Sequence, residues 1–314
     1  MILVSGGSGA MGSRLVRRLV EKGKKIRVLT LPNDPLVARL SGLNCEIFYG
    51  DISDASSLKG AFDGVETVYH LAAIIIAYDP SLFEKINING TRNMIQGSIA
   101  AGVKHFVLIS SASVVYATTN EYARSKQVCE RMIKEQKEMQ YTIIRPTLAY
   151  EKDGGQEFMM FLEYLKKYPI VPFVGRGQAP KNPVHVDDLI KGFVAVEGNP
   201  KAYGKTYNFS GGEEITIWEQ AKLMLKHQGM NKVFVPLPVW LCKLLAAVME
   251  RVMDRPPLTQ YAIARIVQDA NLDHSSATED LGYRPVGFRE GLQKCFPIQS
   301  RVESHGLKSV HSQE

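Results

Sequence analysis

The sequence predicts an α/β fold: a Rossmann-type, doubly wound parallel sheet with a smaller, mostly helical C-terminal lobe. Three observations predict this class. Short apolar runs alternate with helical stretches through the first half of the chain, a glycine-rich turn follows the first run, and the alternation changes after Pro146. Strands buried on both faces have near-continuous apolar sequences, and right-handed crossover helices cover both faces of such a sheet.

The predicted strands are the apolar and β-branched runs at 1–5, 25–30, 45–50, 66–71, 105–110 and 141–146. Helices are expected at 10–22, 35–42, 55–62, 81–101 and 121–139, where apolar residues recur at helical spacing. A helix at 185–197 and a strand at 205–210 then return the chain to the sheet. The expected division is a sheet domain, 1–147 and 183–212, a lobe, 148–182 and 213–298, and a disordered polar tail, 299–314.

The bulk composition is that of an ordinary globular protein, with 45% hydrophobic and 22% charged residues. The four cysteines lie far apart, without CxxC or histidine partners at ligand spacing, so we expect no metal and a reducing compartment. No signal peptide or spanning segment is expected, which predicts a cytoplasmic protein. The apolar helix expected at 239–253 leaves peripheral membrane contact open.

The net charge of +6 includes a basic face on the first helix. Most such faces are simply solvated, but this one also suits phosphate-bearing small molecules or an anionic membrane. No zinc-finger spacing or basic-aromatic interleaving favours nucleic acid. We therefore expect a small-molecule substrate, and we expect the protein to be a homodimer.

The turn "SGGSGAMG", residues 5–12, matches GxGxxG through Gly7, Gly9 and Gly12, and GxxGxxG when Gly6 replaces Gly7. Glycines permit a tight turn and a close approach to pyrophosphate, while the following helix offers free N–H groups. A lone glycine pattern is weak evidence, but here it follows the first strand of a doubly wound sheet. This context predicts a dinucleotide site.

The choice between NAD and NADP depends on the end of the second strand, where an acidic residue would bind the ribose of NAD. Thr30 and Leu31 occupy the expected positions. Asp34 lies about 20 residues beyond the glycines, but it follows a proline and is expected past the strand end. No arginine stands there for NADP, so NAD is favoured and NADP stays open.

The stretch "NEYARSK", residues 120–126, places Tyr122 and Lys126 one helical turn apart, a spacing that chance also supplies easily. Its position at the start of the helix after the fifth strand, downstream of "ISSAS", favours catalysis. A neighbouring ammonium and a positive nicotinamide ring would lower the tyrosine pKa toward the working range. A serine at the strand end, Ser111 or alternatively Ser110 or Ser113, would hold the substrate oxygen.

With these motifs in view, the chain resembles the short-chain dehydrogenase/reductase superfamily, and its extended branch of NAD-dependent epimerases, dehydratases and 3β-hydroxysteroid dehydrogenases. The resemblance runs from residue 1 to about 296 and also rests on "GDISD", "HLAA", "NINGT", "IIRPT" and "NPVHVDDL". It implies Tyr122, Lys126 and Ser111 as catalytic residues, Ser111 also contacting the substrate. It implies a cofactor site formed by Tyr122 and Lys126 together with Gly6, Gly7, Gly9, Ala10, Met11, Gly12, Asp51, Ile52, Leu71, Ala72, Ala73, Asn87, Pro146 and Thr147.

Two features depart from the family pattern: a short link from Ser111 to Tyr122, and Glu151 where a glycine is usual. The short link is similar to atypical members, including relatives of a respiratory complex I subunit, although those commonly lack the Tyr–Lys pair. Lys181, near Arg176, matches the position of an arginine that binds the substrate diphosphate in sugar-nucleotide epimerases. A solvated loop lysine is at least as good an interpretation of Lys181.

The resemblance implies an NAD(P)-dependent epimerase or oxidoreductase that transfers hydride at a sugar carbinol or ketone, the sugar being linked to a nucleotide or a polyprenyl diphosphate. Such an enzyme would act in nucleotide-sugar metabolism. A 3β-hydroxysteroid dehydrogenase-like oxidoreductase is the first alternative. A non-catalytic dinucleotide-binding scaffold is the second, and the intact Ser–Tyr–Lys set argues against it.

Overall fold

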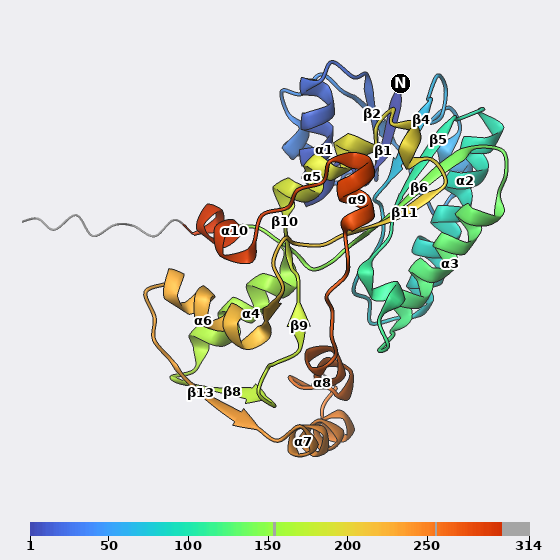
Figure 1. Ribbon diagram of the computed structural model, residues 1–314. Helices are drawn as coiled ribbons and strands as arrows, with labels where there is room; N and C mark the ends of the chain where they lie inside the picture. The colour runs from blue at the N-terminus through green and yellow to red at the C-terminus, as the bar shows by residue number, and fades with distance from the viewer. Residues whose placement is uncertain (153–154, 255, 297–314) are drawn as a thin grey trace, which may run out of the picture.

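Seven parallel strands form the central sheet of the computed structural model, which describes residues 1–152, 155–254 and 256–296 (Figure 1). Their order is β11-β6-β5-β4-β1-β2-β3. The strands are β1 (Ile2–Ser5), β2 (Ile26–Thr30), β3 (Glu46–Tyr49), β4 (Thr67–His70), β5 (His105–Ile109), β6 (Gln140–Pro146) and β11 (Lys205–Phe209). The predicted Rossmann sheet is confirmed, with β1 and β4 flanking the point where the strand order reverses.

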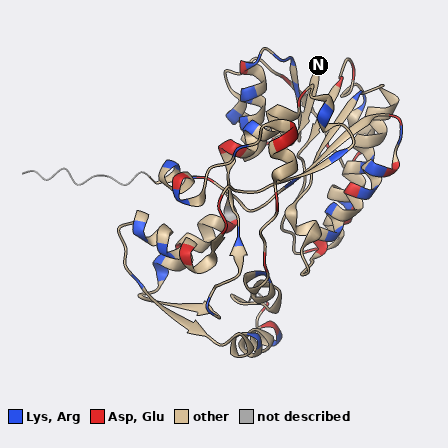
Figure 2. Ribbon diagram, viewed as in Figure 1, with Lys and Arg blue, Asp and Glu red and all other residues tan. Residues whose placement is uncertain are grey.

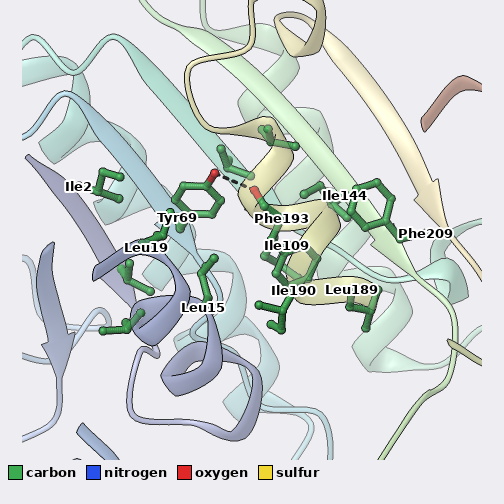
Figure 3. Close-up of a cluster of buried hydrophobic side chains, with 14 of the residues drawn as sticks. Ile2, Leu15, Leu19, Tyr69, Ile109, Ile144, Leu189, Ile190, Phe193 and Phe209 are labelled. Atoms are coloured by element: carbon green, nitrogen blue, oxygen red, sulfur yellow. Dashed lines mark hydrogen bonds between the residues drawn. The ribbon is translucent and has the colours of Figure 1, made fainter. Parts of the chain in front are cut away.

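Helices cover both faces of this sheet, as predicted. The first face carries α1 (Ala10–Glu21) and α5 (Val186–Val196), and the second carries α2 (Gly90–Ala100) and α3 (Glu121–Glu135). In the first layer, Leu15 and Leu19 of α1 pack with Phe193 of α5 beneath the strands (Figure 3). The buried Tyr69 hydroxyl donates to the Phe193 carbonyl at 2.9 Å, which ties β4 to α5.

Two of the helix predictions are wrong. The segments 35–42 and 55–62 form only short 3-10 turns, η1 (Pro35–Leu40) and η2 (Ala55–Leu58). Asp34 and Asp54 precede these turns and accept backbone N–H groups, at Leu36 and Ser56 respectively. Aspartates of this kind favour turns over longer helices. The expected helix 81–101 is divided into a π-helix, η3 (Phe83–Asn89), and α2, and the expected helix 121–139 ends at Glu135.

The lobe has its own apolar core between α4 (Gln156–Lys167), α6 (Ile217–His227) and α10 (Phe288–Cys295). Its strands were not predicted: β8 (Ile170–Val174) pairs in parallel with β13 (Val233–Leu237), and β9 (Pro180–Lys181) pairs antiparallel with β12 (Ile215–Thr216). The remaining pair, β7 (Ala149–Tyr150) with β10 (Val184–His185), connects the lobe to the sheet domain.

The remaining elements are η4 (Ala112–Val115), η5 (Pro200–Ala202), α7 (Val239–Val252), α8 (Gln260–Val267) and α9 (Ser275–Leu281). Although we assigned 213–298 to the lobe, α9 packs against α5 and β11 of the sheet domain. The predicted tail, 299–314, lies outside the described residues. No helix among the described residues is long and apolar enough to span a membrane.

Candidate active site

The glycine turn between β1 and α1 leaves space that side chains would fill. Gly6 has a φ of +71°, and a Cβ there would lie 2.8 Å from the Ala72 backbone nitrogen after β4. A Cβ on Gly12 would overlap the Gly6 carbonyl oxygen and lie 2.7 Å from the Gly7 Cα. The first turn of α1 contains no acidic residue, and no side chain caps its N–H groups. This arrangement fits a pyrophosphate.

Asp34 lies beyond the end of β2, as expected, but its carboxylate lies beside the glycine turn. Its carboxylate accepts hydrogen bonds from the hydroxyls of Ser8, at 2.6 Å, and Thr30, at 2.8 Å. The chain reverses between Leu31 and Asp34, where the Asp34 N–H donates to the Leu31 carbonyl. Pro32 followed by Asn33 with a φ of 61° is the pattern of a type II turn. The structure thus supplies the acidic group expected for NAD.

Hydrogen bonding holds the Asp34 carboxylate in its charged form. The hydrogen bond from Ser8 lowers its pKa, and those from Leu36 and Thr30 act in the same direction against the effect of burial. A negative charge at the end of β2 attracts the ribose hydroxyls of NAD and repels the extra phosphate of NADP.

The Tyr122 phenol and the Lys126 ammonium lie on successive turns of α3, which begins at Asn120. The Asn120 side chain accepts the Ala123 N–H at 2.8 Å and so fixes the start of the helix. Lys126 is only 2% exposed. Ser111, two residues after the end of β5, hydrogen-bonds to Tyr122. The structure therefore brings the three expected catalytic residues together across the carboxyl ends of the strands.

The other two serines have different partners. The Ser110 hydroxyl is buried and donates to Glu130 Oε1 at 2.7 Å, on the side of α3 facing β6. The Ser113 hydroxyl donates to Ser111 Oγ at 2.9 Å. Ser113 therefore orients the Ser111 hydroxyl and is less suited to hold the substrate oxygen itself. This geometry favours Ser111 over Ser110 and Ser113.

Burial is the main influence on the pKa values of Tyr122 and Lys126. Burial raises the pKa of Tyr122 to about 12, opposed by the hydrogen bond from Ser111. The expected lowering of the Tyr122 pKa depends on a neighbouring ammonium together with a positive nicotinamide ring, and the residues of the chain alone do not produce it. Burial also lowers the pKa of the Lys126 ammonium, while nearby Cys129 and Glu130 raise it. A positive nicotinamide ring would add the charge that favours the phenolate.

Asn87 connects α3 to the chain beyond β4. It is 1% exposed and lies in the π-helix η3, a geometry often found at functional sites. Its amide accepts from the Ile74 N–H at 2.9 Å and donates to the Ile74 carbonyl at 3.0 Å and to Ser125 Oγ at 2.9 Å. Asn87 thus holds the segment after Leu71, Ala72 and Ala73 against the helix that carries Tyr122.

The other expected cofactor residues follow strand ends at the same edge of the sheet. Asp51 and Ile52 follow β3, where Asp51 accepts the Ser53 N–H at 2.8 Å and Ile52 packs against Gly90. Pro146 ends β6, and the Thr147 hydroxyl donates to the Asn182 carbonyl at 2.7 Å. Ala10 and Met11 begin α1. These positions border the strand ends at which dinucleotides bind in such sheets.

Lys181 has partners other than a substrate. Its ammonium donates to the Arg265 carbonyl at 3.1 Å and to the Gln268 carbonyl, both at the C-terminal end of α8. Burial lowers its pKa to about 8. These contacts give Lys181 a structural role in the lobe, where cations stabilise helix C-termini.

The lobe also contributes residues that the sequence did not indicate. The Arg265 guanidinium lies 5.1 Å from the centre of the Tyr116 ring, in the loop between Ser111 and Tyr122. Gln268 accepts the Thr118 N–H at 3.0 Å from the same loop. Glu157, in the first turn of α4, raises the pKa of Tyr116 and Tyr122 by its charge. These side chains border the candidate catalytic group, but none belongs to a motif.

Glu151, the second departure from the family pattern, forms an ion pair that crosses from β7 to α1. Its carboxylate is buried and pairs with Arg14, which also lies 3.7 Å from Asp187 of α5. The first helix after the glycine turn is therefore joined to the first segment of the lobe.

Comparison with known proteins agrees with this geometry. A model of the NAD dependent epimerase/dehydratase family matches residues 2–210. The chain belongs to this family. Its membership confirms the predicted extended short-chain dehydrogenase/reductase type, the enzyme class and NAD as the cofactor of the family.

Individual relatives of this family member differ in what they act on. The 3 beta-hydroxysteroid dehydrogenase/Delta 5-->4-isomerase of Mycobacterium tuberculosis is 27% identical, covering 94% of this chain and 89% of that protein. Sterol demethylase protein B of Methylococcus capsulatus is 40% identical over 36% of this chain and 35% of its own length. The UDP-glucose 4-epimerase of Thermus thermophilus, solved in complex with NAD, shares the fold, with a TM-score of 0.72 at 21% identity and coverage of 94% and 97%.

Proposed function

We propose that this protein interconverts a secondary alcohol and a ketone on an apolar substrate, using NAD. The observation that carries the proposal is the Tyr122 phenol, hydrogen-bonded to Ser111 and one helical turn from the buried Lys126. The site lies where the glycine turn and the Asp34 carboxylate would place the cofactor.

The chemistry divides between the chain and its cofactor. Bound NAD supplies the hydride acceptor for the carbinol carbon. The Tyr122 oxygen takes the alcohol proton as the C–O bond becomes a carbonyl, and it returns a proton in the reverse direction. The Ser111 hydroxyl donates a hydrogen bond to the substrate oxygen. The buried Lys126 ammonium would hold the ribose of NAD and, as a positive charge one helical turn away, would favour the phenolate.

Two observations support an apolar substrate. Lys181, the expected ligand of a diphosphate, is already bound to carbonyls of α8. Two of the relatives named above are a steroid dehydrogenase and a sterol demethylase protein. A diphosphate would have to be bound by other cations of the lobe.

A sugar epimerase is the second candidate, and Arg265 is the observation that favours it. Its guanidinium lies beside Tyr116, next to the candidate catalytic group, where it would suit a diphosphate. An epimerase of this kind would act on a nucleotide- or polyprenyl-diphosphate-linked sugar.

The experiment incubates the purified protein with NAD and, separately, a 3β-hydroxysterol, a long-chain 3-hydroxy acid and UDP-glucose. Net formation of NADH with either apolar alcohol supports the proposal. Conversion of UDP-glucose to its epimer without net NADH supports the second candidate and overturns the first. Absence of turnover with all three, despite NAD binding, contradicts both.

Two substitutions separate the chemistry from the fold. Tyr122→Phe removes only the phenolic oxygen, so turnover should fall by about 100-fold or more while NAD binding persists. Tyr141→Phe, in the same sheet domain but outside the site, is the matched control and should behave like the parent protein. Equal turnover in Tyr122→Phe would remove the central residue of both candidates.

A further inference from the structure

An apolar surface lies at the end of the lobe farthest from the seven-stranded sheet. We name it the distal apolar face and define it by six side chains of β8, β13 and α7: Ile170, Val233, Trp240, Leu244, Val248 and Val252. Each is more than half exposed, with Trp240 at 69% and Val252 at 73%. Exposed apolar groups scattered singly are ordinary, whereas a contiguous set marks a binding surface.

The pattern on α7 gives the surface its continuity. Trp240, Leu244, Val248 and Val252 recur every four residues and so form one ridge along the helix. The opposite side, with Cys242 and Ala246, is buried against Ile263 of α8. The helix is thus apolar on both sides, although only one side has a partner among the described residues.

The small sheet extends this ridge. Along β8 and β13, Val171 and Phe173 point into the lobe core while Ile170 and Val233, which are register partners, point outward. Neither strand contains a charged residue (Figure 2). Only Pro238 separates β13 from α7, and both elements lie at the lower edge of the lobe in Figure 1.

Cations surround the distal apolar face. Lys243 and Arg251 of α7 and Lys167 beside β8 are exposed, and none forms an ion pair within the described part of the chain. The one acid of α7, Glu250, is exposed, and both its oxygens accept hydrogen bonds from Gln260 at 2.9 Å. Apolar side chains with a tryptophan, bordered by exposed cations, match the interface of an anionic bilayer.

We propose that the distal apolar face docks onto an anionic lipid surface, with α7 lying in the plane of the interface. This inference goes beyond the proposed function and does not depend on it. The helix that supports α7 is α8, whose C-terminal end contacts the loop between Ser111 and Tyr122 through Gln268 and Arg265. Docking would therefore connect the lipid surface, through α7 and α8, to the loop between Ser111 and Tyr122.

Trp240 provides a direct readout. The chain has two tryptophans, and the other, Trp218, packs between Phe173 and Phe234. In a Trp218→Phe background, vesicles of phosphatidylcholine with about 30% phosphatidylglycerol should shift Trp240 emission to shorter wavelength. The same vesicles should carry the full-length protein upward in flotation, and pure phosphatidylcholine should carry less.

The variant Trp240→Glu/Val248→Glu should reduce vesicle binding roughly tenfold or more, since it places charge on the apolar ridge. Tyr49→Glu is the matched control, because Tyr49 is an exposed aromatic residue of β3, in the sheet domain and not in the lobe, and it should bind like the parent. Circular dichroism checks that each variant is folded. Tyr122→Phe should bind vesicles normally, which separates this inference from the proposed function.

Three results would overturn the inference. The first is no binding to either vesicle. The second is equal binding by the double variant, which would place the contact elsewhere. The third is that the parent protein is a dimer in sedimentation velocity, the double variant is a monomer, and neither binds vesicles. That result would assign the face to a second copy of the chain.

Discussion

Replacing Glu130 with alanine should destabilise the protein by about 3 kcal/mol, because it leaves a cation with no partner beneath the candidate site. Glu130 is 4% exposed and accepts from Arg145 Nε at 2.8 Å and from Ser110 at 2.7 Å. Loss of one partner of a buried pair costs about 3–5 kcal/mol. The lower end applies here, since the Arg145 side chain is 19% exposed and water can reach it.

The assay is urea unfolding followed by circular dichroism at 222 nm. Glu135→Ala, on the exposed side of the same helix, is the control and should change stability by less than about 0.5 kcal/mol. Replacing both partners, Glu130→Leu with Arg145→Met, should cost less than Glu130→Ala alone. If Glu130→Ala lost less than about 1 kcal/mol, the buried ion pair with Arg145 would not be a major source of stability.

Glu130 should also make the stability of the fold depend on pH. Burial alone would raise the pKa of Glu130, but hydrogen bonds from Arg145 and Ser110 outweigh it, so the folded-state pKa is lowered. The pair therefore stabilises the fold at pH values above the pKa of the unfolded carboxyl. Its contribution is lost as the pH falls through the folded-state value. The stability difference between the parent and Glu130→Ala should thus shrink below about pH 4.5.

Three further outcomes are expected. Gly12→Ala should abolish NAD binding in calorimetry, since its Cβ would overlap the Gly6 carbonyl, whereas Gly9→Ala, with its nearest atom at 3.3 Å, should lose less. Asp34→Asn should raise kcat/KM for the NADP couple relative to the NAD couple by about tenfold or more, and an unchanged ratio would argue against the Asp34 assignment. Lys181→Met should lower the stability of the lobe by about 1–2 kcal/mol, measured by urea unfolding, because two carbonyls of α8 lose their donor.

The strands were predictable because their buried sequences are continuous and their ends are marked by turn residues. The helical periodicity also located α1, α3 and α5. The short turns η1 and η2 were mistaken for helices, since a few apolar residues at helical spacing do not distinguish a single turn from two or three. The pairing of β8 with β13 depends on contacts between segments about 60 residues apart, which local patterns do not reveal.

The candidate site was predicted where residues share a motif and missed where a turn or a distant segment supplies them. Pro32 does place Asp34 beyond the end of β2, but the turn that Pro32 begins carries the carboxylate back to Ser8. The spacing of about 20 residues from the glycines was the available signal. Arg265 and Gln268 contact the loop after Ser111 from the C-terminal end of α8, and no local sequence pattern indicates that they do so.

The ion pair between Arg14 and Glu151 limits how this chain can be recombined with its relatives. Arg14 follows the glycine turn and Glu151 begins the lobe, so two modules that look separable in sequence share a buried charge. A chimera that takes its lobe from a relative with glycine at position 151 would remove the buried partner of Arg14 and leave it only Asp187 of α5, at 3.7 Å. Position 14 should therefore be exchanged together with the lobe, although the strands β2 to β7 lie between the two positions in the chain.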